Sequence, residues 1–144
     1  MDLYKIVIAS DHAGYLLKDK VLHHLQAAGH KVTDLGTNSD KTVDYPDYAD
    51  YVCENILDET SQLGILICST GIGMSIAANR HSGIRAALAT SPFMAERARL
   101  HNDANILVLG SKIIDDIVNL EIVDKFLSAS FEGGRHIKRL EKIG

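Results

Sequence analysis

The stretch LGILICSTGIGMS, residues 63–75, is the clearest indication of how the chain folds. Its first six residues, Leu63 to Cys68, are apolar without alternation, which is typical of a parallel strand that helices cover on both faces. A glycine-rich turn, Ser69 to Gly73, follows, and we expect a helix after it that ends near Arg80 to Gly83. A strand, a turn and a helix in this order indicate an α/β fold.

The same alternation continues on both sides of this stretch. Aliphatic runs predict strands at residues 3–9, 30–35, 63–68, 84–89 and 105–109. Amphipathic segments predict helices at residues 15–28, 46–57, 91–100 and 113–129. We therefore expect one α/β domain over residues 1–144, a Rossmann-like three-layer α/β/α sandwich with a five-stranded parallel sheet. In such folds function lies in the turns that leave the strands, here residues 10–14, 36–46, 69–73, 90–91 and 110–112.

The composition excludes several classes of protein. The chain has 144 residues, of which 46% are hydrophobic, and its formal net charge of −4 argues against nucleic acid as a partner. No apolar run approaches the roughly 18 residues of a membrane span, and the run after Lys5 is too short for a signal peptide. Two cysteines are too few for a disulfide scaffold, and the sequence has no His-x-x-x-His pair or Cys/His cluster. We expect a cytoplasmic protein without metal or other cofactor.

Chemistry is indicated first by Cys68 and the turn after it. Several backbone N–H groups should converge there on a phosphate or on an oxyanion that develops in a transition state, and the helix terminus would favour a thiolate. The turn does not match three known glycine-loop patterns. Met74 stands where a P-loop has lysine and where a cysteine phosphatase has arginine. Ile76 stands where a dinucleotide-binding site has its third glycine. The alternative is a buried strand-end cysteine. We favour the reactive role.

Further candidate residues lie after the first strand and at the end of the helix before the last strand. Asp11 and His12 come after the first strand, where they would orient a sugar hydroxyl and donate to phosphate, or else form a helix cap beside an incidental histidine. His101 ends the helix before the last strand, where a single histidine also suits the negative end of the helix dipole. For each segment, the sequence leaves both a role in ligand binding and a capping role open.

The C-terminal tail, residues 130–144, is basic in an acidic protein. Residues 131–144 carry four basic and two acidic side chains, a net charge of +2, so the remainder of the chain carries −6. If the segment after Gly134 is helical, Arg135 and Arg139 lie on one face, where two guanidinium groups suit a phosphate. The alternative is a solvated helix. Together with the glycine turn, the tail favours a phosphate site.

Six motifs occur in a fixed order: Asp11–Gly14, Asp44–Pro46, Cys68–Gly73, Ala77–Asn79, His101–Asn105 and Gly133–His136. In this order the chain resembles, from end to end, ribose-5-phosphate isomerase type B, in the wider group that includes the galactose-6-phosphate isomerase subunits. The resemblance implies metal-independent interconversion of D-ribose 5-phosphate and D-ribulose 5-phosphate in the non-oxidative pentose phosphate pathway. It also implies homodimers, often paired further into tetramers, in which each site is completed by the neighbouring subunit.

The resemblance gives the matching positions roles. Cys68 would be the base, and His101 would open the furanose ring. Asp11 and His12 would contact the substrate, Tyr45 would form a wall or bind a hydroxyl, and Asn102 would bind the sugar. The turn would cradle the intermediate with Ser69, Thr70, Gly71, Ile72 and Gly73, while Lys112, Arg135 and Arg139 would bind chiefly the phosphate. Apart from the resemblance, the chemistry suggests that Thr70, beside the substrate oxygens, would shuttle a proton between them. Two positions depart from the family, since Ser69 stands where glycine is usual and Lys112 where arginine is common.

Two rival functions stay open. Aldose–ketose isomerisation through a cis-enediolate needs one base poised near neutral pH and donors for the enediolate oxygens, which the turn offers. The same chemistry suits a six-carbon substrate such as allose 6-phosphate or galactose 6-phosphate, although a full set of Cys68, His101 and both tail arginines argues against a galactose-6-phosphate isomerase subunit. A non-catalytic module that binds sugar phosphate would have no use for a thiol base.

Overall fold

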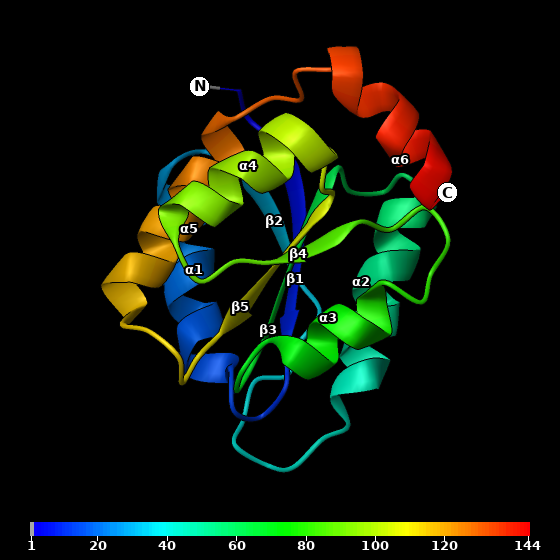
Figure 1. Ribbon diagram of the computed structural model, residues 1–144. Coiled ribbons are helices and arrows are strands. Elements are labelled where there is room, and N and C mark those ends of the chain that lie inside the picture. Colours follow the sequence, from blue (N-terminus) through cyan, green and yellow to red (C-terminus); the bar gives the residue numbers. More distant parts are fainter. Residues whose placement is uncertain (1) are drawn as a thin grey trace.

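A five-stranded parallel sheet forms the middle layer of the computed structural model, which describes residues 2–144 (Figure 1). Its strands are β1 (Lys5–Ser10), β2 (Lys31–Asp34), β3 (Leu63–Cys68), β4 (Ala86–Leu88) and β5 (Ile106–Gly110). They lie in the order β2-β1-β3-β5-β4, and each neighbouring pair is parallel. The predicted Rossmann-like fold is confirmed. The chain leaves β1 toward one side and β3 toward the other, so the topological switch point lies between these two strands.

Helices cover both faces of the sheet, as the unbroken apolar strands predict. One face packs against α1 (Tyr15–Ala27), α4 (Pro92–Asn102) and α5 (Asp116–Ser128), and the other against α2 (Tyr45–Leu57) and α3 (Ile72–Ala78). Successive strand residues alternate between two buried cores, so Ile65 and Ile67 lie in one core while Leu66 and Cys68 lie in the other. In residues 2–144, none of the helices combines the length and the apolar composition of a membrane span.

Some boundaries differ from the expectation. The helix after the glycine turn ends at Ala78, earlier than predicted, and β4 has only three residues. The Asn79 side chain covers the free edge of β4, because it donates to the carbonyl of Ala86 (2.9 Å) and accepts from its N–H (2.8 Å), in the place of a further strand. The chain between β5 and α5 forms a turn, so α5 begins at Asp116 rather than at Ile113.

The tail does not form one continuous α-helix. It consists of a short 3₁₀ turn, η1 (Gly134–His136), followed by α6 (Ile137–Ile143). Gly133 and Gly134 have φ values of 69° and 56°, a left-handed backbone that an α-helix cannot include. Arg135 therefore lies in η1 and Arg139 in α6, which alters the predicted arrangement on one helical face.

The strands begin at one edge of the sheet and end at the other. We call these the amino edge, where β1, β3 and β5 begin, and the carboxyl edge, where they end at Ser10, Cys68 and Gly110. In Figure 1 the amino edge lies at the top, beside α6, and the carboxyl edge lies at the bottom, where α3 begins. The edges are about 17 Å apart along β3, at about 3.3 Å for each residue.

Candidate active site

Three turns meet at the carboxyl edge. The N–H of Asp11 donates to the carbonyl of Ile67 (3.1 Å), which brings the turn after β1 against the end of β3. The N–H of Lys112 donates to the carbonyl of Ser69 (3.0 Å), which brings the turn after β5 to the same place. Parallel strands end at one edge, so sequence segments about 100 residues apart form one surface there. The structure thus gathers Asp11, Ser69 and Lys112 as the sequence predicts.

The glycine turn holds the Cys68 sulfur against a backbone donor. Cys68 is 5% exposed, and the N–H of Gly71 points at its Sγ from 3.2 Å. Gly71 has a φ of 82°, and a Cβ at this position would lie 2.4 Å from the side chain of Leu88, so only glycine fits. The sulfur therefore lies at the start of α3, where it faces a backbone donor of the glycine turn.

The second cysteine has a different environment. Cys53 is fully buried in α2, where its Sγ donates to the carbonyl of Ala78 (3.7 Å). Burial raises the pKa of the Cys53 thiol to about 12, and the negative charges of Asp50 and Glu54 add to the effect. Cys53 stays protonated at neutral pH and serves packing, so Cys68 is the cysteine suited to act as a base.

Thr70 and Tyr45 line the mouth of the turn. The Thr70 hydroxyl oxygen accepts the N–H of Ile72 (3.2 Å), and both residues are exposed. The Tyr45 ring lies over Gly73 so closely that a Cβ there would be 2.6 Å from the ring and 2.9 Å from its hydroxyl oxygen. Gly73 thus allows Tyr45 to form a wall beside the turn, with its hydroxyl available to a ligand.

The turn after β1 fixes both of its polar side chains. Asp11 is 6% exposed, and its Oδ1 accepts the N–H groups of Ala13 (2.9 Å) and Gly14 (3.1 Å), so it stabilises the turn. The N-cap of α1 is Gly14, so the interpretation of Asp11 as the helix cap is wrong. The N–H of Val43 donates to Nδ1 of His12 (3.2 Å). A neutral His12 ring therefore carries its proton on Nε2, where it is free to donate to a ligand.

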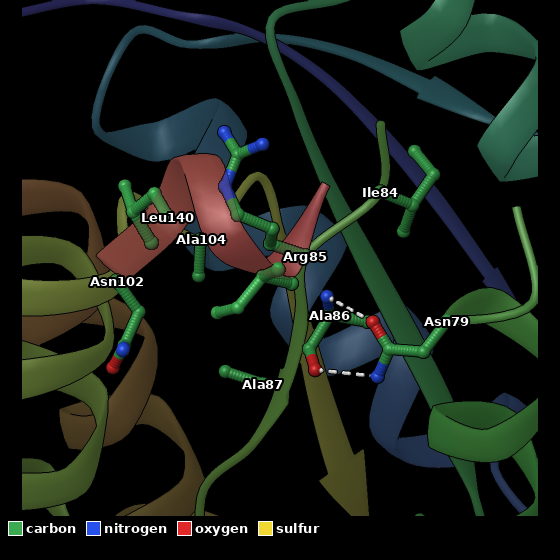
Figure 2. A pocket seen from close by; sticks show the side chains of 9 residues that line it. Asn79, Ile84, Arg85, Ala86, Ala87, Asn102, Ala104 and Leu140 are labelled. Carbon is green, nitrogen blue, oxygen red and sulfur yellow. Dashed lines mark hydrogen bonds between the residues drawn. The ribbon is translucent and has the colours of Figure 1, made fainter. Parts of the chain in front are cut away.

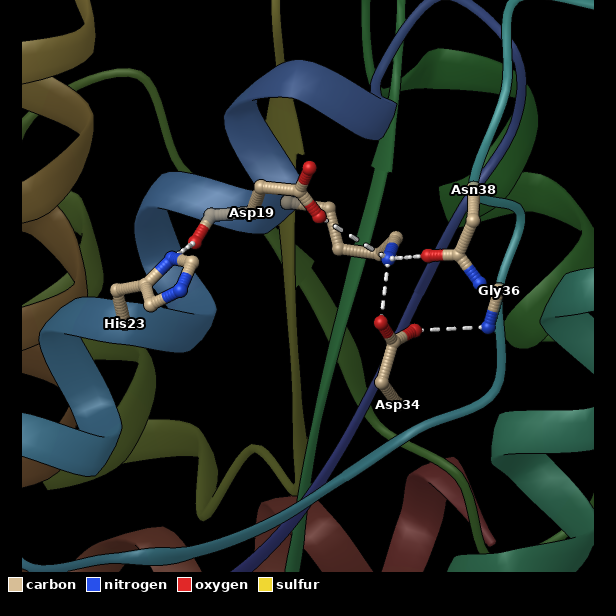
Figure 3. Close-up of polar contacts among 6 residues, drawn as sticks. Asp19, His23, Asp34, Gly36 and Asn38 are labelled. Carbon is tan, nitrogen blue, oxygen red and sulfur yellow. Dashed lines mark hydrogen bonds and ion pairs between the residues drawn. The ribbon is translucent and has the colours of Figure 1, made fainter.

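A buried lysine anchors the loop that leads to Tyr45, and the sequence analysis did not find it. The Lys18 side chain is fully buried, and its Nζ donates to Oδ2 of Asp34 (2.7 Å) and to Oδ1 of Asn38 (2.8 Å), as Figure 3 shows. Asp34 in turn accepts the N–H of Gly36 (2.8 Å). A lysine in the middle of an amphipathic helix gives no local signal of this contact.

The remaining predicted residues lie at the amino edge. His101 and Asn102 end α4, and the N–H of Gly64, at the start of β3, donates to the carbonyl of the nearby Asn105 (2.9 Å). The N–H of Glu132 donates to the carbonyl of Leu100 (3.0 Å), so the tail follows the end of α4. The His101 and His136 rings stack with centroids 4.4 Å apart.

The candidate residues thus form two groups within one chain. The carboxyl edge holds Asp11, His12, Tyr45, Cys68, Ser69, Thr70, Gly71, Ile72, Gly73 and Lys112. The amino edge holds His101, Asn102, Arg135 and Arg139. The length of β3 separates them, so Cys68 and His101 of the same chain lie at opposite edges of the sheet.

A groove lies beside the free edge of β4 (Figure 2). It has a volume of about 340 Å³ and is lined by Ala86 and Ala87 of β4, Asn102 of α4, and Leu140 and Ile143 of α6 among others. No residue of the glycine turn lines it. The groove therefore belongs to the amino edge, next to Asn102.

One candidate set of metal ligands occurs within residues 2–144. The ligand atoms of His101, Glu132 and His136 all lie within 4.8 Å of one another. The expectation that the chain holds no metal rested on spacing along the sequence. That reasoning did not detect this group, because the tail returns to the end of α4 only in the folded chain.

Known proteins resemble this chain over nearly its whole length. The family model described as Ribose/Galactose Isomerase matches residues 6–143. Ribose-5-phosphate isomerase B of Escherichia coli (strain K12) is 44% identical over 139 residues, 96% of this chain and 93% of that protein. The crystal structure of a ribose 5-phosphate isomerase from Thermotoga maritima is 55% identical, covers 97% of each chain and superposes with a TM-score of 0.96. Ribose-5-phosphate isomerase B from Mycoplasma genitalium, solved with bound ribulose-5-phosphate, is 47% identical, covers 96% and 93% of the two chains and has a TM-score of 0.93.

Proposed function

The chain belongs to the ribose/galactose isomerase family, and from that premise we infer that it interconverts D-ribose 5-phosphate and D-ribulose 5-phosphate. The enzyme is an aldose–ketose isomerase. The observation that carries this conclusion is the Cys68 sulfur at the mouth of the glycine turn, 3.2 Å from the N–H of Gly71. A module that only binds sugar phosphate has no need of a thiol in this position.

In the proposed reaction, Cys68 moves one proton between two carbon atoms. The thiolate takes the proton from C2 of the open-chain aldose, and the electron pair of that bond forms the C1–C2 double bond of a cis-enediolate. The thiol then returns the proton to C1. Thr70, at the exposed mouth of the turn, carries the hydroxyl proton from O2 to O1. The product is the ketose, and no redox partner is consumed.

The glycine turn stabilises the charge that develops in this step. Negative charge appears on the enediolate oxygens. The N–H groups of the turn that are not already donating to Cys68 or Thr70 would donate to these oxygens, and the backbone fixes them before the substrate binds. Donors held in advance need no reorganisation, and the loss of one comparable donor costs roughly 10²–10³ in turnover. This explains why the chain uses backbone rather than flexible side chains beside the reacting carbon.

We further propose a homodimer in which each site joins the carboxyl edge of one copy to the amino edge of the other. Support comes from the separation of the two groups within one chain and from the exposure of Asn102, Arg135 and Arg139. His101 of one copy would open the furanose ring of a substrate held beside Cys68 of the other. Two such dimers would pair into a tetramer.

The phosphate would be bound by groups from both copies. His12 and Lys112 lie at the carboxyl edge, and Arg135 and Arg139 would come from the neighbour. Guanidinium groups bind phosphate oxygens in pairs, whereas Lys112 offers a point charge. This contact is remote from the reacting carbon, so its binding energy orients that carbon against the thiolate.

We propose that residues 1–144 act as one isomerase domain in the cytoplasm, in the non-oxidative pentose phosphate pathway, with the tail 130–144 contributing to the phosphate site. A catalytic thiolate must stay reduced, and the cytoplasm keeps thiols reduced. Both cysteines of the chain are free.

The test is an assay of ribose 5-phosphate turnover with a metal chelator present. We expect ribulose 5-phosphate to form at an unchanged rate, and allose 6-phosphate and galactose 6-phosphate to react more slowly. Faster turnover of a six-carbon phosphate would reassign the substrate. Tight binding of ribose 5-phosphate without turnover would identify a binding module instead.

A further inference from the structure

Three potential metal ligands from two distant segments meet at the amino edge. His101 ends α4, whereas Glu132 and His136 belong to the tail. Nε2 of His101 lies 4.0 Å from Oε1 of Glu132, and Nε2 of His136 lies 3.6 Å from Oε2 of the same carboxylate. These contacts are too long for hydrogen bonds, so the donor atoms face one another without using their lone pairs on each other.

The Nε2 atom of His136 is buried beside this group. His136 is only 6% exposed, and within residues 2–144 its Nε2 has no hydrogen-bond partner. Buried polar atoms without a partner are rare in proteins and call for an explanation such as an ion. Burial, followed by the positive charge of Arg135 and then His101, lowers the pKa of His136 below its ordinary value.

The structure assigns to His101, Glu132 and His136 a binding site for a divalent transition-metal ion, with Zn²⁺ as the ion of choice. Two imidazoles and one carboxylate are a zinc ligand set that leaves the fourth position to water, whereas Mg²⁺ and Ca²⁺ prefer oxygen ligands alone. Tetrahedral bonds of about 2.0–2.1 Å place ligand atoms about 3.4 Å apart, so the group must contract by about 1.4 Å at most.

The environment sets the cost of this contraction. The two rings are stacked with planes only 17° apart, and one must tilt so that both lone pairs point at the same ion. The Glu132 side chain is 45% exposed and that of His101 33%, which leaves room for the movement and a path for the ion. Arg135 and Arg139 add positive charge nearby, and this charge repels a metal cation. The negative charge of the Glu132 carboxylate offsets the repulsion and makes the site possible.

A zinc ion in this site would inhibit the enzyme. This consequence rests on the proposed function, in which His101 opens the furanose ring of a substrate in the neighbouring copy. Zn²⁺ occupies the lone pair of Nε2 that His101 needs for proton transfer. The isomerase would need no metal for catalysis and still respond to free zinc.

Binding is tested without any turnover measurement. The full-length protein, freed of metal by dialysis against a chelator, is titrated with zinc chloride by calorimetry and in competition with a chromophoric chelator. We expect one ion for each chain, bound more tightly at pH 7.5 than at pH 6, because the imidazoles must be neutral. Glu132→Gln should weaken binding by roughly tenfold or more, and the exposed Glu141→Gln in the same tail should bind like the wild type.

Two further variants exclude other sites. His136→Gln, checked for folding by circular dichroism, should also weaken binding, whereas Cys68→Ala should retain it. The cobalt complex should show d–d bands without a thiolate-to-cobalt charge-transfer band, because all three ligands are nitrogen or oxygen. No uptake of zinc, equal uptake by Glu132→Gln, or a thiolate band would overturn the assignment.

The inhibition is measured separately. Zinc should lower wild-type turnover of ribose 5-phosphate, and chelator should restore it. Glu132→Gln, compared with its own turnover in the absence of zinc, should resist zinc at the concentration that inhibits the wild type. Equal inhibition of both would overturn the inhibitory role. If the wild type has no isomerase activity at all, the proposed function fails, while the zinc titration still decides the site.

Discussion

The two edges of the sheet provide different kinds of chemistry. At the carboxyl edge, backbone N–H groups and a nearly buried sulfur are held by close packing, as the glycine at position 71 shows. At the amino edge, the predicted contacts are the exposed side chains of Asn102, Arg135 and Arg139. The first edge suits proton transfer and charge stabilisation, and the second suits the capture of a charged group that arrives from outside.

The difference indicates that neither edge is complete. Cys68 lacks a cationic clamp of paired arginines, and the arginines lack a base, since the length of β3 lies between them. Two copies in opposite orientation would supply both sets to each site. In this proposal, a fold of this size would obtain an enclosed site by association rather than by adding a second domain.

The largest effect is expected at the carboxyl edge. Cys68→Ala removes the base and should lower kcat roughly 10²–10⁴-fold, the range that general bases contribute, while substrate binding persists. The matched control is Cys53→Ala, which should keep its activity because that thiol is protonated and structural. Steady-state kinetics and ligand titration check both. Unchanged turnover in Cys68→Ala would remove the cysteine from the mechanism.

The rigidity of the carboxyl edge should depend on Lys18. Lys18→Met leaves the Asp34 carboxylate without its partner and should lower the free energy of unfolding by about 3 kcal/mol. This is the lower end of the range for a broken buried ion pair, because Asp34 is partly exposed. Urea denaturation measures it. As a control, Lys20→Met removes an exposed ion pair with Asp116 and should cost much less. Equal costs would mean that the buried contact does not anchor the loop.

Mixed subunits address the comparison of the edges directly. Cys68→Ala and His101→Asn should each be inactive, but a heterodimer of the two has one site with both residues intact. After refolding together in equal amounts, about a quarter of wild-type activity should return, because half of the dimers are mixed and half of their sites work. If the mixture stays inactive, the edges of different copies do not meet.

Arg135, unlike His101 at the same edge, should affect binding more than chemistry. Arg135→Ala should raise KM for ribose 5-phosphate roughly tenfold or more, as the loss of a charged hydrogen bond predicts, with a smaller change in kcat. Lys138→Ala, an exposed change in the same tail, is the control. An equal loss of affinity for an unphosphorylated analogue would contradict a phosphate contact.

The smallest effect concerns pH and also lies at the amino edge. Burial lowers the pKa of His30, whose Nδ1 accepts the N–H of Tyr4 (3.0 Å), and burial with Arg135 lowers that of His136. Both rings bind protons more readily in the unfolded chain. Stability should therefore be full above about pH 6.5 and decline as the pH falls below it. Urea midpoints at pH 7.5 and 5.5 measure the decline, and His30→Gln should make it shallower; an unchanged slope would exclude His30.

Much of the fold follows from local patterns. The bounds of β3 agree with the prediction, because an unbroken apolar run between a polar turn and a glycine turn fits a covered parallel strand. The predicted bounds were less accurate where a side chain takes the hydrogen bonds that a neighbouring strand would make. Asn79, which follows α3, does so at the free edge of β4. No periodicity in the sequence encodes such a contact.

The residue types and their order along the chain were enough to predict the alternating strands and helices, the glycine turn with Cys68, and the basic tail, because these depend on spacing over a few residues. The tertiary structure alone decided which of these residues meet. It placed His101 and Arg135 at the edge opposite Cys68, buried Lys18 against Asp34, and brought Glu132 and His136 to His101. The reason is physical: strand length and chain reversal set distances between segments, and neither leaves a pattern in the neighbouring residues.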